Sequence, residues 1–415
     1  MKHRVKRLVL LVSSYSLSTR GKSSAASSLV PISSNVLHRI ESAFIGGLCG
    51  DALALGGHYE YDAAKIKAHV GKYTDFLAPG AKMGGQTHGV GWGAANYHPG
   101  KTGGDLTDAG EVAIFLLDYL ATTQGQYDFD GYAKHWLDEI RNGYGSCNFQ
   151  SVLADGSCPA GSKPGYLNGG TRRTLQALQQ RPGATGDLRK ALAADVNCLV
   201  AATHFLPLFL VATDVHQLVA DAKSTVYLSH KNRDPVAAAE FLTRAFHAIF
   251  HGDMALDEAL TKAAHDTGDP FITKCLADAQ RKVAEASDPQ SDLSTHPFVD
   301  DVALTSMARL WDVGKSEPIK VGKASPAEGA LPGSLYFALR YAHSLEEALV
   351  ANAGVGGDSA VRGMVIGMLL GAVHGREGIP ARWLGTLKAL PHVEAQFGVL
   401  RQGQARGVGK GGQEL

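Results

Sequence analysis

Apolar side chains recur every three to four residues along most of the chain, the spacing of a helix with one buried face. Val36, Ile40, Phe44 and Leu48 form one such series. The same spacing predicts helices at 111–120, 188–211, 235–250, 254–286 and 334–353. Segments of alternating β-branched residues are nearly absent, so the sequence predicts an all-α fold.

A glycine ladder is the most distinctive helical feature. Glycine stands at every fourth position from Gly363 to Gly375, within an apolar run. Glycines at this spacing share one helix face and allow another helix to approach closely. The run begins at the sequence Gly-Gly-Asp-Ser, residues 356–359. Asp358 and Ser359 are both favourable N-cap residues, so one interpretation is a capped core helix. The other is a loop whose exposed amides surround an anion or a metal-bound oxygen.

Two glycine-rich stretches interrupt the helical pattern, at 72–107 and 146–170. Connections of this length are usually functional or disordered. No internal repeat or linker divides residues 35–400. We therefore expect a leader at 1–34, one helical domain at 35–400 and a disordered tail at 401–415.

Charge is unevenly distributed. The chain has 40 basic and 40 acidic residues, but residues 1–34 contain six basic side chains and no carboxylate. The rest of the chain therefore contains 34 basic and 40 acidic residues. This mild excess of negative charge argues against nucleic acid as a partner. The leader is rich in serine and has only a short apolar stretch, which favours a mitochondrial or plastid transit peptide. The alternative is a disordered tail on a cytoplasmic protein. No apolar run is long enough for a membrane span.

The five cysteines include no C-x-x-C pair. Cys147 and Cys158 are close enough in sequence to be bridged. The odd count and the lack of a clear secretory signal instead favour free, mostly buried thiols.

Three segments, at 50–62, 103–111 and 356–359, place oxygen ligands near predicted helix ends. Thr107, Asp108, Glu111 and Asp358 supply the hydroxyl and carboxylate oxygens that Mg²⁺ prefers. Each segment also has a simpler interpretation. Asp108 as N-cap with Glu111 at N3 is an ordinary capping box. The 50–62 segment fits a Gly-Gly C-cap with surface acids. The histidines in the loops, His58, His88 and His98, are typically hydrogen-bonded loop residues.

Taken together and in this order, these segments resemble the ADP-ribosylglycohydrolase family, from about residue 40 to 390. The match looks closest to the branch that includes the jellyfish J1-type crystallins. It rests on five phrases in register: Asp-Ala-Leu-Ala-Leu-Gly-Gly-His at 51–58, Tyr-His-Pro-Gly-Lys at 97–101, Ser-Leu-Tyr-Phe-Ala-Leu-Arg-Tyr-Ala at 334–342, Val-Gly-Gly-Asp at 355–358 and Ile-Pro-Ala-Arg-Trp-Leu at 379–384. The resemblance implies a single large orthogonal helical bundle. In that fold, two Mg²⁺ ions lie between an N-terminal Thr-Asp-Asp turn and a C-terminal Gly-Asp-x-Asp turn.

The family's metal ligands are only partly present. Thr107 and Asp108 match the first two residues of the N-terminal turn, but Ala109 stands at the second aspartate. Glu111 is a candidate substitute for that aspartate, because crystallin-like members carry an acid at this later place. Asp358 matches the first aspartate of the C-terminal turn.

The second aspartate of that C-terminal turn is replaced by Ala360. With a carboxylate missing from each turn, the full two-ion site of the family is not expected. We expect Mg²⁺ as the cofactor, bound as one or two ions. Because of the missing carboxylates, one ion or none is the safer expectation.

The resemblance implies hydrolysis of the C1″ glycosidic bond of an ADP-ribose conjugate or related ribosyl conjugate, with Asp108 or Glu111 as the base. The acid that the family places near its first helix matches Asp51, Glu60 or Asp62 only loosely. The candidate substrate-binding residues are Asp51, His58, His88, Gly356, Gly357 and Ser359.

The alternative function is a catalytically inactive, crystallin J1-like member that acts as a nucleotide-binding or structural protein. The expected partner is an ADP-ribose-type small molecule or an ADP-ribosylated substrate. We expect a monomer with no nucleic-acid partner and no membrane span.

Overall fold

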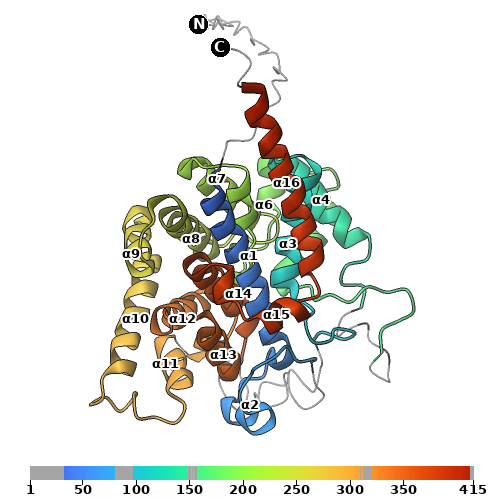
Figure 1. The fold of residues 1–415 in the computed structure, drawn as a ribbon. Helices are drawn as coiled ribbons and strands as arrows, with labels where there is room; N and C mark the ends of the chain where they lie inside the picture. Colours follow the sequence, from blue (N-terminus) through green and yellow to red (C-terminus); the bar gives the residue numbers. More distant parts are fainter. Residues whose placement is uncertain are drawn as a thin grey trace, which may run out of the picture.

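The computed structural model describes residues 32–79, 97–147, 151, 153, 157–308, 310–311 and 319–411. The predicted all-α fold is confirmed: helices account for the regular structure of these residues apart from one short strand pair (Figure 1). The α-helices are α1 Ser34–Ala54, α2 Ala63–Val70, α3 Asp108–Thr122, α4 Phe129–Arg141, α5 Gly169–Gln180, α6 Gly186–Ala191, α7 Val215–Val226, α8 Arg233–Gly252, α9 Leu256–Thr267, α10 Pro270–Ser287, α11 Val299–Met307, α12 Ala327–Arg340, α13 Leu345–Val355, α14 Ser359–His374, α15 Ala381–Thr386 and α16 Leu390–Gly411.

Short elements connect the helices. The 3₁₀ turns are η1 Leu55–Gly57, η2 Leu199–Ala202, η3 Leu206–Leu210, η4 Val321–Lys323 and η5 Arg376–Gly378. The strands β1 Leu310–Trp311 and β2 Ile319–Lys320 form an antiparallel pair. One hydrophobic cluster extends from Ile40 in α1 to Leu400 in α16, so the described helices share a core.

The core is organised around α1 and α14, which run side by side through the centre of the molecule (Figure 1). A Cβ atom on Gly367 would lie 2.0 Å from the carbonyl oxygen of Gly46, and one on Gly50 would lie 2.1 Å from that of Gly363. The two backbones are therefore in contact, as the glycine ladder predicts. Gly375 does not extend the ladder, because it ends α14 with a φ of 68°.

Two predicted helices are each divided in two. Gly268 ends α9 in the left-handed conformation, and Asp269 and Pro270 start α10, so 254–286 is not one helix. The segment 334–353 belongs to α12 and α13, because Ser344 caps a new helix. Helical spacing continued across both breaks and concealed them.

The prediction of one helix at 188–211 was wrong. Only α6 is α-helical there, and it ends at Ala191. The chain then runs beside the segment after α7, where the amide of Ala194 donates to the carbonyl of Ser229. Two 3₁₀ turns follow, the second with Pro207 near its start. Tertiary hydrogen bonds at Ala194 thus outweigh the local helical pattern.

The chain ends differ from the predicted boundaries. The helical domain begins slightly earlier, with the hydroxyl of Ser33 accepting from the amide of Val36 at the start of α1. Residues 401–411, assigned to a disordered tail, are helical because α16 continues to Gly411. The transit peptide predicted within residues 1–34 lies almost entirely outside the described residues. No helix in the described part of the chain is both long and apolar enough to span a bilayer.

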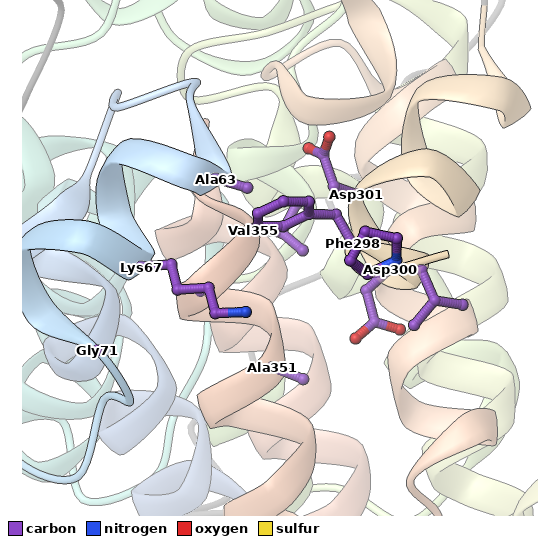
Figure 2. A pocket seen from close by; sticks show the side chains of 11 residues that line it. Ala63, Lys67, Gly71, Phe298, Asp300, Asp301, Ala351 and Val355 are labelled. Atoms are coloured by element: carbon purple, nitrogen blue, oxygen red, sulfur yellow. The ribbon is translucent and has the colours of Figure 1, made fainter. Parts of the chain in front are cut away.

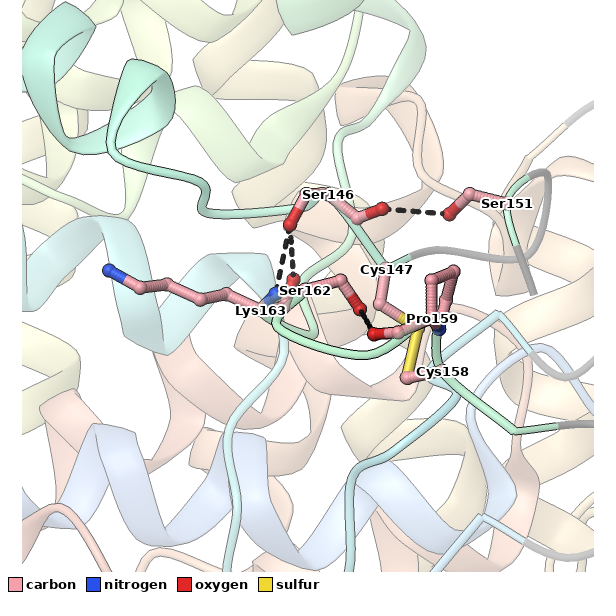
Figure 3. Close-up of a disulfide and its surroundings, with 7 residues drawn as sticks. All are labelled: Ser146, Cys147, Ser151, Cys158, Pro159, Ser162 and Lys163. Carbon is pink, nitrogen blue, oxygen red and sulfur yellow. Dashed lines mark hydrogen bonds between the residues drawn. A yellow bond between two sulfur atoms is a disulfide. The ribbon is translucent and has the colours of Figure 1, made fainter. Parts of the chain in front are cut away.

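The cysteine prediction was wrong for two residues, because Cys147 and Cys158 form a disulfide (Figure 3). The amide of Cys147 donates to the carbonyl of Lys163, and the amide of Gly165 donates back to the carbonyl of Cys147. The bridge thus closes a loop immediately before residues 166–168. Cys49, Cys198 and Cys275 are buried free thiols, as expected.

Removing this bridge with the C147S/C158S double variant is expected to lower the free energy of unfolding by up to about 3 kcal/mol, because the unfolded chain gains loop entropy. Thermal unfolding with and without a reductant tests this. The difference from wild type should disappear in reductant. Equal stability under oxidising conditions would contradict a stabilising role.

Candidate functional site

Asp51 and Thr107 join the end of α1 to the start of α3. The buried carboxylate of Asp51 accepts hydrogen bonds from the Thr107 amide at 2.7 Å and the Thr107 hydroxyl at 2.5 Å. Burial raises the pKa of Asp51 to about 7, against the lowering effect of these hydrogen bonds. Asp51 therefore fixes the position of the turn that carries the next acid.

Asp108 is the first residue of α3 and is buried. Thr107, not Asp108, is the N-cap, and its hydroxyl accepts from the Ala109 amide at 3.3 Å, which corrects the capping-box interpretation. The Asp108 carboxylate instead accepts a hydrogen bond of 3.0 Å from the side-chain amide of Asn168. Burial raises its pKa to about 6, and the negative charge of Asp358 contributes to the increase. Acids far apart in sequence therefore influence each other in one site.

Asp358 precedes α14 but makes no side-chain cap hydrogen bond. Its carboxylate lies 3.0 Å from Nε2 of His58, and both side chains are buried. Its amide donates to the carbonyl of Lys323 at 2.7 Å. The geometry favours a site residue over the capped-helix alternative, because the side chain turns away from the amides that a cap would satisfy.

The two glycines before Asp358 are needed where the chain closes on its neighbours. Gly356 and Gly357 have φ values of 74° and 73°, in the left-handed region. A Cβ on Gly356 would lie 2.2 Å from the carbonyl oxygen of Glu60. The Gly357 amide donates to that carbonyl at 2.5 Å, so these amides bind protein groups. The hydroxyl of Ser359 is buried and makes no hydrogen bond to the described residues.

Lys323 and Arg362 both contact this turn. Lys323 Nζ donates to the Asp301 carboxylate at 2.5 Å and to the Tyr61 carbonyl at 2.6 Å. The fully buried guanidinium of Arg362 donates to the carbonyls of Lys323 and Gly356. The Arg362 guanidinium and the Lys323 carbonyl thus hold the backbone of the turn, and sequence analysis assigned neither residue to the site.

A pocket of about 210 Å³ lies next to Asp301, which is one of its lining residues (Figure 2). The pocket is bounded by α2, α11 and α13. Across it, Nζ of Lys67 lies 5.3 Å from the centroid of the Phe298 ring. Asp301 lines this pocket and also pairs with Lys323. The pocket therefore adjoins the Asp358 turn.

His58 connects Asp358 to a second histidine. Nδ1 of His58 lies 2.7 Å from Nε2 of His98, and the two rings stack. Both imidazoles are buried, and burial together with the neighbouring His58 holds the pKa of His98 well below its usual value. The result is a hydrogen-bonded chain from Asp358 through His58 to His98. The predicted site contained His58 but not His98, although both lie in phrases shared with the family.

Tyrosines surround this chain. Tyr59 stacks on His58 with ring centroids 3.9 Å apart and packs edge-on against Tyr97 and Tyr166. Tyr59 has a φ of 67°, an unfavourable conformation for a residue with a side chain. Such strain concentrates at functional sites. This favours a functional role for the His58–Tyr59 turn over an ordinary helix end.

Two of the three acids of the 50–62 segment are not surface acids, whereas Asp62 is exposed as expected. Asp51 and Glu60 are fully buried, and Glu60 pairs with Lys65 at 2.8 Å. Asp62 caps α2 through the Lys65 amide. Of the three loose matches to the family's acid, only Asp51 contacts the Thr107 turn. His88 lies outside the described residues.

The predicted Mg²⁺ ligands each contact another protein group. The Thr107 hydroxyl is held by Asp51, and Asp108 is held by Asn168. The Glu111 carboxylate pairs with Lys101 Nζ at 2.5 Å. Within the described residues, no three His, Cys, Asp or Glu side chains gather as a metal-binding group. Mg²⁺ binding by these donors therefore stays a prediction.

A narrow pocket of about 10 Å³ adjoins Asp108 and is lined by residues of α3, α4, α5 and α7. Its volume is that of about one water molecule. Asp108, Asn168 and His204 are among its lining residues. Nε2 of the buried His204 has no hydrogen-bond partner among the described residues. Burial lowers the pKa of His204 to about 3, so the ring is neutral and its free nitrogen suits a water molecule.

Comparisons with known proteins agree with this geometry. A solved structure described as an ADP-ribosylglycohydrolase-related protein complex superimposes with a TM-score of 0.53 and 21% identity, over 89% of this chain and 99% of that chain. At this identity the likeness concerns the fold alone. No curated protein matches significantly. The sequence pattern of the ADP-ribosylglycohydrolase family matches residues 33–406, which include both acidic turns and the helices that join them. The chain is therefore a member of the ADP-ribosylglycohydrolase family.

Proposed function

We propose that the protein hydrolyses a glycosidic bond to ADP-ribose or a related ribosyl conjugate, with Asp108 as the general base. The observation that carries this proposal is the environment of Asp108. Its buried carboxyl has a pKa of about 6 and lies within the electrostatic reach of Asp358. A base is most effective when its pKa lies near the working pH.

The chemistry requires a water positioned between Asp108 and C1″ of the ribose. The ionised Asp108 accepts a proton as the water oxygen bonds to C1″, and the leaving group departs with the electron pair of its bond to C1″ and takes up a proton from solvent. Asn168 orients the carboxylate through its hydrogen bond, and the narrow pocket offers a route for water. Glu111 is less suited to be the base, because Lys101 neutralises it.

We assign a positioning role to His58. Its imidazole bridges the Asp358 carboxylate and His98, and its charge interaction lowers the pKa of Asp108. His58 fixes Asp358 without a metal.

Replacing His58 with glutamine is expected to reduce kcat by about tenfold or more, because Asp358 and His98 lose their common hydrogen-bond partner. KM should change less than kcat, since the acids rather than the substrate contacts are displaced. His69→Gln, at an exposed histidine of α2, is the matched control. Equal kcat in the His58 variant and wild type would remove this role.

We further propose that this site acts without Mg²⁺, because each predicted oxygen ligand already has a protein partner. Millimolar Mg²⁺ is therefore expected to leave the melting temperature unchanged, with or without ADP-ribose. A ligand that binds only the folded state must stabilise it, so thermal unfolding is a direct measurement. A clear upward shift in Mg²⁺ would restore the metal-assisted mechanism implied by the family resemblance.

The alternative function is a catalytically inactive family member. It is suggested by Ala109 and Ala360, which stand where the family pattern has acids. It predicts binding of ADP-ribose without release of product from any conjugate. Assays with arginine-, serine- and acetate-linked ADP-ribose separate the two functions. Turnover of any one conjugate supports the hydrolase, and binding without turnover supports the alternative.

A further inference from the structure

A third pocket, of about 300 Å³, is lined by none of the residues of the Asp358 turn. It is formed by α4, the end of α5, the turn at 181–185 and α6. Four basic side chains line it, Lys134, Arg141, Arg181 and Arg189, with one acid, Asp130. This concentration of positive charge is unusual, because residues 35–415 hold more acidic than basic side chains.

Arg189 is the innermost of these cations and is only 3% exposed. Its Nη2 donates to the carbonyl of Leu228 at 2.8 Å, and its guanidinium lies 5.6 Å from the Trp136 ring. Its Nη1 has no hydrogen-bond partner among the described residues. A buried charge normally has an ionic or hydrogen-bonded partner for every donor. Arg189 is therefore a cation that lacks its full complement of acceptors.

The charged side chains that line the pocket give it a net positive charge. Asp130 accepts a hydrogen bond from the Gly186 amide at 2.7 Å, and Lys134 pairs with Asp138 outside the pocket lining. Within the described part of the chain, no carboxylate comes within ion-pair distance of Arg141 or Arg181. Three arginines thus line one small pocket with a single acid among its lining residues.

We propose that this pocket binds a phosphate-bearing small molecule, at a site separate from the hydrolytic centre. Guanidinium groups bind phosphate oxygens in pairs of parallel hydrogen bonds, which suits an anion with several oxygens. The apolar side chains of Leu137, Leu178 and Pro182 line the same pocket and can cover the organic part of a phosphate ester. The enclosed volume selects a small molecule over an extended polyanion.

Trp136 places the pocket in contact with the candidate active site. Its ring centroid lies 5.6 Å from the Arg189 guanidinium, and the same residue lines the narrow pocket of Asp108. An anion that draws the Arg189 guanidinium outward would change the surroundings of the Trp136 indole. Tryptophan fluorescence is therefore expected to report binding.

The experiment measures binding of inorganic phosphate and of ribose 5-phosphate to the full chain by calorimetry, with chloride at matched ionic strength as reference. Both probes should bind, and chloride should not. Tighter binding of the ester identifies a phosphomonoester ligand, whereas equal binding identifies the free ion. No heat beyond that of chloride for either probe would overturn the proposal.

Variants locate the binding. Arg141→Gln/Arg181→Gln should weaken phosphate binding by about tenfold or more, as expected when charged hydrogen bonds are lost. These residues lie at the pocket wall, so hydrolytic activity should be unchanged. Arg173→Gln, an exposed arginine on α5, should bind phosphate normally. Asp108→Asn should also bind it normally, which separates this site from the hydrolytic centre. Equal affinity in wild type and the Arg141/Arg181 variant would place the phosphate elsewhere and contradict the proposal.

Discussion

Replacing Asp108 with asparagine is expected to lower kcat by about 100- to 10,000-fold, the usual contribution of a general base. Asparagine has nearly the same shape and can still accept the hydrogen bond from Asn168, so the fold should persist. Release of free ADP-ribose from the conjugate that the wild type accepts is the measurement. Asp118→Asn, on the outer part of the same helix, is the control and should retain activity.

The pH dependence follows from the same residue. A general base works in its ionised form, and the Asp108 pKa is about 6. The wild-type rate is therefore expected to rise with pH through about 6 and to be low in more acidic solution. A rate that is flat between pH 5 and 7 would exclude Asp108 as the base.

As the pH rises, the stability of the fold should decrease where the activity increases. The pKa of Asp108 is higher in the folded protein than its ordinary value of 3.8, so the folded state binds this proton more tightly than the unfolded state. The carboxylate therefore costs stability as the pH rises from about 4 to 6, and the full cost is present above that window. Asp108→Asn is expected to raise the free energy of unfolding at pH 8 by up to about 3 kcal/mol. Denaturant unfolding at pH 8 tests this, and a destabilised variant would contradict it.

Replacing Gly367 with alanine is expected to destabilise the protein by about 3 kcal/mol or more, since the added methyl overpacks a rigid contact. Its Cβ would lie 2.0 Å from the backbone oxygen of Gly46, and a carbonyl cannot move aside as a flexible side chain can. The central helices α1 and α14 would have to separate. This separation would also displace Asp51 relative to Asp358, so activity should fall with stability.

Gly398→Ala is the matched control for this change. Gly398 lies inside α16, and a Cβ there would meet nothing within 4 Å. Alanine should stabilise this position by about 0.5–1 kcal/mol through its greater helix propensity. Urea unfolding of both variants gives the comparison. Similar effects at the two positions would show that the glycine ladder is not a packing device.

Much of the fold could be predicted because it depends on repeating patterns. Helical periodicity indicated the all-α class, and the spacing from Gly363 to Gly371 indicated a close helix pair. The pattern could not identify the partner helix, because contacts between Gly46 and Gly367 join segments that are far apart in sequence. Periodicity also hid the breaks at Gly268 and Ser344, since the apolar spacing continues across them.

The site was predicted unevenly for a related reason. Asp108 and Asp358 stood out because each lies in a short motif at a helix start. Asn168 and His98 come from long loops, and their contacts with the acids depend on how those loops fold. Burial was also invisible in the sequence. Asp51 looked like a surface acid at a helix end, yet it lies in the core and supports Thr107.

The most direct test of the shared site is a double-mutant cycle on ADP-ribose release, with Asp108→Asn, Asp358→Asn and the two combined. Residues that act as one catalytic unit give non-additive losses. The double variant should therefore be no slower than the slower single variant. Losses that multiply, or a wild type that releases no ADP-ribose from any conjugate, would contradict a single hydrolytic centre built from both ends of the chain.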